Sequence, residues 1–140
     1  MNQGVQGCYA RSMRAASKAV NDYYSEMLRP TGVAVVQFSI LLHVEELETC
    51  CVGELAEAAE LDYTTVARSI KPLIERGLIS DRSGHRGRKR CLCLTDAGRA
   101  VIATGLPLWK QAQEDVRLLI GSAEIERLQA TLARLKGIAG

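Results

Sequence analysis

The chain has 140 residues, 47% of them hydrophobic, which suffices for one domain with its own core and excludes an intrinsically disordered protein. The net charge of +2 by itself favours no class of partner. No apolar run of about 18 residues is present and residues 1–7 are polar, so we expect neither a membrane span nor a secretory signal, but a cytoplasmic protein.

The first two predicted helices differ in how much of their surface is apolar. Over residues 8–28, apolar side chains recur at spacings of three and four, which is typical of an amphipathic helix; Pro30 and Gly32 then end it. Residues 33–47 are apolar on adjacent faces. We therefore expect the second helix to be almost completely buried.

A helix-turn-helix is predicted next, from a short helix over residues 52–60 and another over residues 63–76. Asp62 is a favourable N-cap residue for the second of these helices, and Gly77 is placed to end it in a left-handed conformation. Pro72 lies inside this helix and removes one backbone hydrogen bond. We expect a bend there, or a shortened helix.

After residue 77 the apolar period changes from that of a helix to that of a strand. Residues 78–80 and 91–94 predict two short strands, and the glycine-containing segment 82–90 between them predicts a hairpin tip. The centre of the chain is therefore expected to form a helix-turn-helix with a two-stranded wing.

Two long helices are predicted at the C-terminal end. We expect Thr95 to cap a helix that runs to about residue 120 with a kink at Pro107, and Ser122 to cap a last helix through residue 135. A chain of this length cannot readily bury the apolar stripes of both the first and the last helix, so a partner chain is expected; a compact monomer is the alternative. The stripe of the last helix is Ile125, Leu128, Leu132 and Leu135.

Charge is distributed unevenly along the chain. Residues 82–90 contain five lysines or arginines and no acidic residue, whereas residues 45–60 contain six glutamates and no basic residue. A cationic hairpin directly after a helix-turn-helix favours contact with the phosphates and minor groove of DNA, although a solvated loop tip has the same composition. The basic candidates are Arg82, Arg86, Arg88, Lys89 and Arg90.

The polar face of the 63–76 helix carries donors and acceptors of moderate length, which suit base edges and phosphates in a major groove. Arg68 has the geometry to grip O6 and N7 of a guanine with two hydrogen bonds. An ordinary solvated helix face is the alternative interpretation. The candidates are Tyr63, Thr64, Thr65, Arg68, Ser69 and Lys71.

Five segments, taken in order, resemble the MarR family of bacterial transcription regulators. They are Leu28-Arg-Pro-Thr-Gly-Val33 with Gln37-Phe38, Val52-Gly-Glu-Leu-Ala56, Leu61-Asp-Tyr-Thr-Thr-Val66, Leu73-Ile-Glu-Arg-Gly-Leu-Ile79 and Leu94-Thr-Asp-Ala-Gly98. The resemblance covers residues 8–135 and implies a mainly α fold with a small β wing. Within a single domain of residues 1–140, it implies a winged helix-turn-helix core at 33–97 and dimerisation helices at 8–32 and 98–138.

The resemblance also implies a homodimeric repressor that binds double-stranded DNA at a pseudo-palindromic operator, with the 63–76 helix in the major groove and the wing in the minor groove. A small effector or thiol chemistry would release it by changing the spacing of the two DNA-reading heads. Two positions depart from the family pattern. Gly87-Arg88 stands where the family commonly has an Asp-Arg pair, so Arg88 lacks its orienting acid, and Ala34 replaces a capping Thr or Ser.

The cysteines have three interpretations that the sequence leaves open. Cys91 and Cys93 alternate on the last wing strand, and a short strand at Cys50 and Cys51 would bring four thiols near one another. The first interpretation is that these thiols are buried and inert. The second is that they sense oxidants or thiophilic metals, and the third is that they form a structural metal site. Cys8, at the start of the first helix, is a separate candidate thiol. We expect no cofactor to be required for folding, and a thiophilic metal or an oxidant is a possible effector.

Other functions have weaker support in the sequence. His43 is a candidate for an effector cleft with Arg14 or Tyr24, although a histidine in the core with its hydrogen bonds satisfied is the alternative.

The sequence contains two histidines and lacks the HExxH, P-loop and GxSxG motifs. No recognisable set of catalytic residues is left, so we do not expect an enzyme. A winged helix that binds only proteins is the alternative function, but the five cations of the hairpin argue against it.

Overall fold

The computed structural model describes residues 7–84 and 89–139, and these residues form a mainly helical chain with one small sheet. The prediction of a mainly α fold with a small β wing is thereby confirmed. None of the helices in the described ranges has the length and apolar content needed to cross a bilayer. The elements are α1 (Tyr9–Met27), η2 (Arg29–Thr31), α2 (Val35–Leu47), β1 (Thr49–Cys50), α3 (Val52–Ala59), α4 (Tyr63–Glu75), β2 (Ile79–Asp81), β3 (Leu92–Leu94), α5 (Asp96–Ile120) and α6 (Ser122–Lys136).

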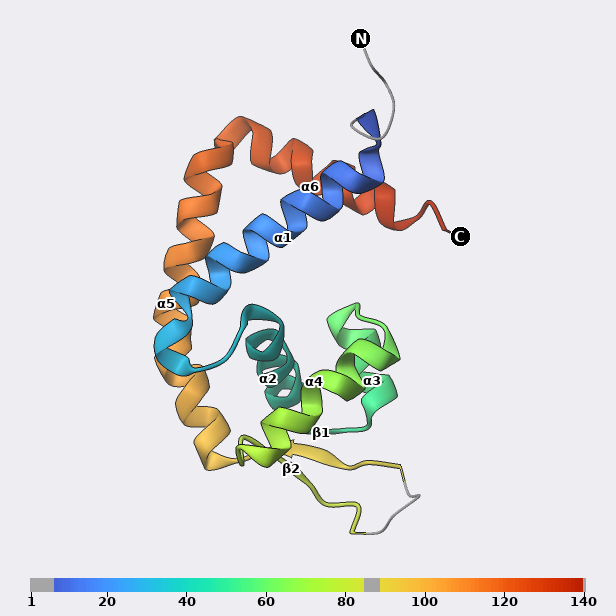
Figure 1. The fold of residues 1–140 in the computed structure, drawn as a ribbon, viewed down its shortest axis with the longest axis vertical. Coiled ribbons are helices and arrows are strands. Elements are labelled where there is room, and N and C mark those ends of the chain that lie inside the picture. Colours follow the sequence, from blue (N-terminus) through green and yellow to red (C-terminus); the bar gives the residue numbers. More distant parts are fainter. Residues whose placement is uncertain (1–6, 85–88, 140) are drawn as a thin grey trace.

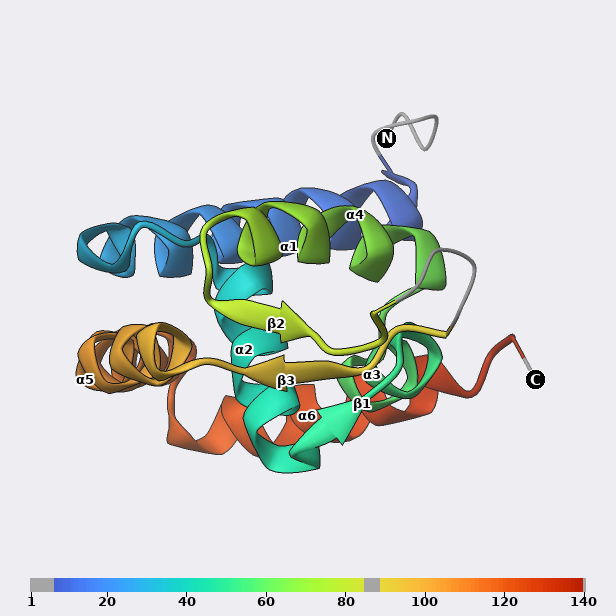
Figure 2. The same cartoon turned by 90° about the horizontal axis from the view of Figure 1, so that it is seen from below.

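The long helices and the winged core occupy different parts of the molecule. Helix α5 forms one edge, α1 packs across it, and α6 turns back from its far end (Figure 1). Helices α2, α3 and α4 and the sheet lie beside the first half of α5. The strands are antiparallel in the order β1-β3-β2, so β1 adds a third strand to the two of the wing (Figure 2).

The core is built from aliphatic side chains around one phenylalanine. Phe38 of α2 is fully buried, and α5 approaches it closely because residue 105 is a glycine. A Cβ at Gly105 would lie 2.4 Å from Cε2 of Phe38, and one at Gly98 would lie 2.3 Å from the carbonyl oxygen of Leu78. The two glycines therefore set how closely α5 packs on α2 and on the start of the wing. The largest fully buried side chains are Phe38, Leu28, Ile40, Leu41, Leu55, Ile70, Leu73, Ile79, Leu92, Val44 and Val66.

The ends of α4 follow the sequence prediction. The carboxylate of Asp62 accepts a hydrogen bond from the backbone N–H of Thr65, as an N-cap residue does. At the other end, Gly77 has a φ of 73°, and the N–H of Leu78 donates to the carbonyl of Leu73 over 2.9 Å. This backbone geometry is a Schellman ending, and it turns the chain directly into β2.

Two local predictions were wrong. Helix α2 is not almost completely buried: α1, α3, α4, α5 and the sheet pack against it, yet Leu47 at its end is 37% exposed. Gly121 rather than Ser122 is the N-cap residue of α6. Helix α4 continues through Pro72 to Glu75, which excludes the shortened helix, while the alternative of a bend stays a prediction. Helix α5 runs as one helix through Pro107, where the kink also stays a prediction.

Thr95 joins the wing to α5, and its replacement is expected to destabilise the fold. Its hydroxyl oxygen accepts from the N–H of Gly98 over 3.0 Å, while its proton is donated to the carbonyl of Gly77 over 2.7 Å. Thr95→Ala should lower the free energy of unfolding by about 1–2 kcal/mol, because it removes both bonds. Thr95→Ser, which keeps the hydroxyl, is the control in urea denaturation. Equal losses in the two variants would contradict the capping role.

Candidate nucleic-acid interface

Helix α4 is anchored by one face and presents the other. Its inward residues Val66, Ile70 and Leu73 are buried in the core, which fixes the direction of the opposite face. Of the six predicted contact residues on α4, Tyr63, Thr64, Arg68 and Lys71 are exposed, and Thr65 and Ser69 are half-buried. The structure therefore brings these six residues together on the accessible side of one helix.

The hydroxyl of Thr65 is engaged in capping α4. It donates to the carboxylate of Asp62, which also accepts from the N–H of Thr65. The hydrogen bond from the Thr65 side chain, with a smaller contribution from the charge of Arg68, holds the pKa of Asp62 below its usual value. The proton of Thr65 is thus committed inside the protein, so Thr64 and Arg68 are better placed to donate to a partner.

Arg76, which the sequence analysis did not single out, ties the end of α4 to the turn before α2. Its Nη1 donates to the carbonyl oxygen of Gly32 over 2.8 Å, and its guanidinium covers that glycine. Gly32 has a φ of 76°, so the turn places its carbonyl toward α4 without strain. The bond helps to orient α4 relative to the rest of the core. In the sequence, the only indication of this hydrogen bond is the arginine at the end of the predicted 63–76 helix.

The stem of the wing exposes part of the predicted basic cluster. Arg82, Lys89 and Arg90 are exposed in the segments that follow β2 and precede β3. Arg86 and Arg88 lie outside the described residues, so their predicted contacts stay predictions. The described part of the wing therefore supplies three exposed cations, all in its stem.

Asp81 organises this stem and was missed by the sequence analysis, which took the hairpin to lack an acid. Its carboxylate accepts from the N–H of Ser83 over 3.0 Å and from the N–H of Cys91 over 3.2 Å, and it pairs with Arg90 over 3.4 Å. Burial opposes its ionisation, but these hydrogen bonds and the charge of Arg90 together hold its pKa below the usual 3.8. Asp81 thus orients one wing arginine, although Gly87 lacks the acid of the family pattern.

Removing this carboxylate should loosen the wing stem. Asp81→Ala leaves two backbone N–H groups without their acceptor and is expected to lower the free energy of unfolding by about 1–3 kcal/mol. Because the folded-state pKa lies below the unfolded one, this stabilisation is present above pH 3.8 and is lost as the pH falls through the lowered pKa. Asp22→Ala, which removes a solvent-exposed partner of Lys18, is the control and should change little. Identical pH profiles of stability for Asp81→Ala and the parent would contradict this role.

Comparison with known proteins agrees with this geometry. The MarR family model matches residues 31–90, which span α2, β1, α3, α4 and β2 and end before β3. The winged-helix core of this chain is similar to the MarR family. The transcriptional regulator MosR of M. tuberculosis, solved in complex with DNA, is 29% identical, and the match covers 92% of this chain and 96% of that chain with a TM-score of 0.77.

Two further matches differ in what they show about this chain. BpsR of Bordetella bronchiseptica, whose DNA binding is regulated by 6-hydroxynicotinic acid, has a TM-score of 0.86 over 97% of this chain and 98% of that chain, and at 20% identity it shows the fold alone. The phenylalanine–tRNA ligase alpha subunit of Pyrococcus horikoshii is 37% identical over 68 residues, or 49% of this chain. The chain spans only 13% of the length of that curated relative.

The four cysteines at the sheet, Cys50, Cys51, Cys91 and Cys93, lie close together but do not share one face. Cys50 pairs with Leu92 and packs into the core, whereas Cys93 is paired with Thr49 on the other face of the sheet and donates to the carbonyl of Ser80. Burial, followed by Glu54 and the neighbouring thiols, raises the pKa of Cys50 to about 11. Within residues 7–84 and 89–139, no group of three or more His, Cys, Asp or Glu side chains is arranged to hold a metal ion.

The remaining thiols have different surroundings. Cys51 is buried and caps α3, because its sulfur accepts from the N–H of Glu54, whose carboxylate accepts in turn from the N–H of Cys51. Cys91 is half-buried beside Lys89. Cys8 is exposed at the start of α1 and makes no side-chain capping bond.

The three residues proposed for an effector cleft do not converge within one chain. Tyr24 is buried and its hydroxyl donates to Gln113 of α5, and burial raises its pKa. His43 is half-buried, and its Nδ1 lies 2.8 Å from the carbonyl of Ser39, so this nitrogen carries the proton. Arg14 is exposed on α1, about 15 Å along the helix from Tyr24 at 1.5 Å per residue.

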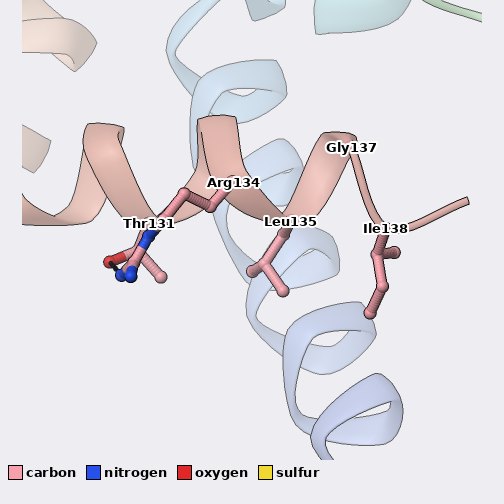
Figure 3. Close-up of a pocket in the computed structure, with 5 residues that line it drawn as sticks. All are labelled: Thr131, Arg134, Leu135, Gly137 and Ile138. Atoms are coloured by element: carbon pink, nitrogen blue, oxygen red, sulfur yellow. Dashed lines mark hydrogen bonds between the residues drawn. The ribbon is translucent and has the colours of Figure 1, made fainter. Parts of the chain in front are cut away.

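The helices outside the winged core carry apolar side chains that the single chain leaves exposed. No residue of α6 is buried, and its stripe residues Leu128 and Leu132 are 37% and 40% exposed. At the end of α6, Leu135 and Ile138 point to the same side and line an apolar hollow (Figure 3). The other large exposed apolar side chains of these helices are Tyr9, Met13, Val20, Tyr23, Leu118 and Leu119.

Proposed function

We propose that this chain is a transcriptional repressor that binds double-stranded DNA in a sequence-specific manner. The observation that carries the proposal is α4, whose apolar face is packed in the core while Tyr63, Thr64 and Arg68 remain exposed, in a chain whose wing stem also exposes three cations. An exposed recognition helix with a flanking basic hairpin fits a major groove and the adjacent backbone. The 29% identity to a regulator solved with DNA supports the same function.

We propose further that the active form is a homodimer in the cytoplasm and that its operator is pseudo-palindromic. Helices α1 and α6 expose apolar side chains along their lengths, and a second copy of the chain would bury them. Two copies related by a two-fold axis would present two α4 helices to successive major grooves. A small effector or oxidation of the thiols would release DNA by changing the distance between these helices.

The proposal is tested by selecting a preferred duplex from random sequences and comparing Arg68→Ala with the parent. Loss of a two-pronged contact to guanine should weaken binding to the selected duplex by about 1–3 kcal/mol, while binding to random duplex changes little. Arg127→Ala is the matched control, because Arg127 is an exposed arginine on α6, paired with Glu124 and far along the chain from α4.

Two results would count against the proposal. Equal losses on selected and random duplexes would show that Arg68 reads no base. A parent protein that binds no duplex at low salt would favour the alternative of a winged helix that binds only proteins, since phosphate contacts are strongest under that condition.

A further inference from the structure

The register of the sheet brings two cysteines face to face. Thr49 pairs with Cys93 and Cys50 with Leu92 in antiparallel strands. The next pair in this register is Cys51 with Cys91, immediately beyond the end of β1. Cys51 keeps an extended backbone, with φ −93° and ψ 171°, so the alternation of side chains continues to it. Directly opposed residues of antiparallel strands point to the same face of the sheet.

The hydrogen bonds around this pair identify its geometry. The carbonyl of Cys91 accepts from the N–H of Arg82 over 2.8 Å, so the backbone of Cys91 is directed toward the β2 side of the wing. The N–H of Cys51 donates to Glu54 and its carbonyl accepts from Leu55, so neither group bonds to Cys91. Cys51 and Cys91 are therefore a non-hydrogen-bonded pair, in which the two Cα atoms are typically about 4.5 Å apart. Disulfides span Cα separations of about 4.4–6.8 Å.

The other cysteines are less suited to a bond with either member. Cys50 points to the opposite face and packs against the core with Leu92. Cys93 is opposite Thr49 and donates to the carbonyl of Ser80. Cys8 is on α1, outside the winged core. Cys51 and Cys91 line one hollow that opens to the surface, and Cys50, Glu54 and Lys89 also contribute to its lining, so the register rather than the hollow sets Cys50 apart.

We propose that Cys51 and Cys91 are an oxidisable dithiol that closes to an intramolecular disulfide when the protein meets hydrogen peroxide. Cys91, the more accessible of the two, attacks a peroxide oxygen as its thiolate. The O–O bond breaks, the leaving hydroxide takes up a proton as water, and Cys91 becomes a sulfenic acid. The sulfur of Cys51 then attacks that of Cys91, forming the S–S bond and breaking the S–O bond, and the hydroxide leaves as water with the proton of Cys51. Two thiols lose two electrons and one peroxide becomes two waters.

The bond would join the first residue before α3 to the strand that leads out of the wing tip. Cys51 caps the first helix of the helix-turn-helix, and the N–H of Cys91 is held by Asp81, the residue that orients Arg90. An effect of this link on DNA binding rests on the proposed function. The disulfide itself does not rest on the proposed function, because it is detected by the mass of the protein in the absence of DNA.

The experiment oxidises a Cys8→Ser variant with hydrogen peroxide, alkylates it under denaturing conditions and counts the free thiols by mass spectrometry. Cys8→Ser leaves four cysteines and prevents cross-linking through the exposed thiol. We expect a monomeric chain in which two thiols are protected from alkylation and are released again by dithiothreitol. Cleavage after Lys and Arg leaves Cys50 with Cys51, and Cys91 with Cys93, in shared peptides. The pairing is therefore assigned from variants.

Single replacements made in the Cys8→Ser background decide the pairing. Cys51→Ser and Cys91→Ser should each abolish the intramolecular disulfide, whereas Cys50→Ser and Cys93→Ser should each retain it. The proposal is overturned if all four thiols stay free, if Cys91→Ser still protects two thiols, or if Cys50→Ser or Cys93→Ser prevents closure while the variant remains folded by circular dichroism. A disulfide that forms normally in a protein that binds no duplex would leave this proposal intact and overturn the proposed function.

Discussion

Replacing Leu128 and Leu132 of α6 together with aspartate is expected to yield a folded monomer that has lost its operator affinity. Neither side chain is buried in the single chain, so the substitutions should cost the fold of one chain little. In the proposed dimer the same side chains lie in the apolar contact, where two unpaired carboxylates are strongly unfavourable. Because binding of two linked α4 helices exceeds that of one by avidity, affinity for the selected duplex should fall by about 100-fold or more.

Light scattering gives the mass of the variant in solution, and an equilibrium titration gives its affinity. Ala123→Asp with Ala130→Asp is the matched control, since it adds the same charge on the side of α6 away from the apolar stripe. This control should remain dimeric and bind the operator. A Leu128→Asp, Leu132→Asp protein that keeps the parent's mass and affinity would show that α6 is not the interface.

Adding one methyl group at Gly105 of α5 is expected to destabilise the fold strongly. The new Cβ would lie 2.4 Å from Cε2 of Phe38, whose ring is fully buried. Overpacking of this kind should lower the free energy of unfolding by about 3 kcal/mol, although alanine has the higher helix propensity. Urea denaturation of Gly105→Ala measures the loss.

Two further variants separate the clash from the change in helix propensity. Gly53→Ala in α3 places its Cβ no closer than 3.9 Å to another atom, so it should stabilise the protein by about 0.5–1 kcal/mol. Phe38→Leu combined with Gly105→Ala should recover part of the loss, because the shorter side chain removes the ring that the methyl group meets. Additive losses in this double variant would contradict a direct contact between residues 38 and 105.

Most helix boundaries and helix faces of this protein can be predicted from its sequence. Asp62, Gly77 and Thr95 were recognised as helix boundaries because capping depends on residues a few positions apart, and each boundary appears in the structure. The contact face of α4 was also predicted, since the spacing of its apolar residues determines which side faces the core. At Pro72 the alternative of a shortened helix was wrong, because α4 continues to Glu75 with its apolar face packed in the core.

Only the tertiary structure decided which distant residues meet. The acid of the wing was sought beside Arg88, yet Asp81 holds Arg90 from the neighbouring strand, a contact set by the register of β2 and β3. The same is true of Arg76 with Gly32, and of the separation of Cys50 from Cys93 onto opposite faces. Helical period and capping are short-range properties that a sequence carries residue by residue. Strand register and helix packing depend on the simultaneous fit of many side chains, so they emerge only when the whole chain has folded.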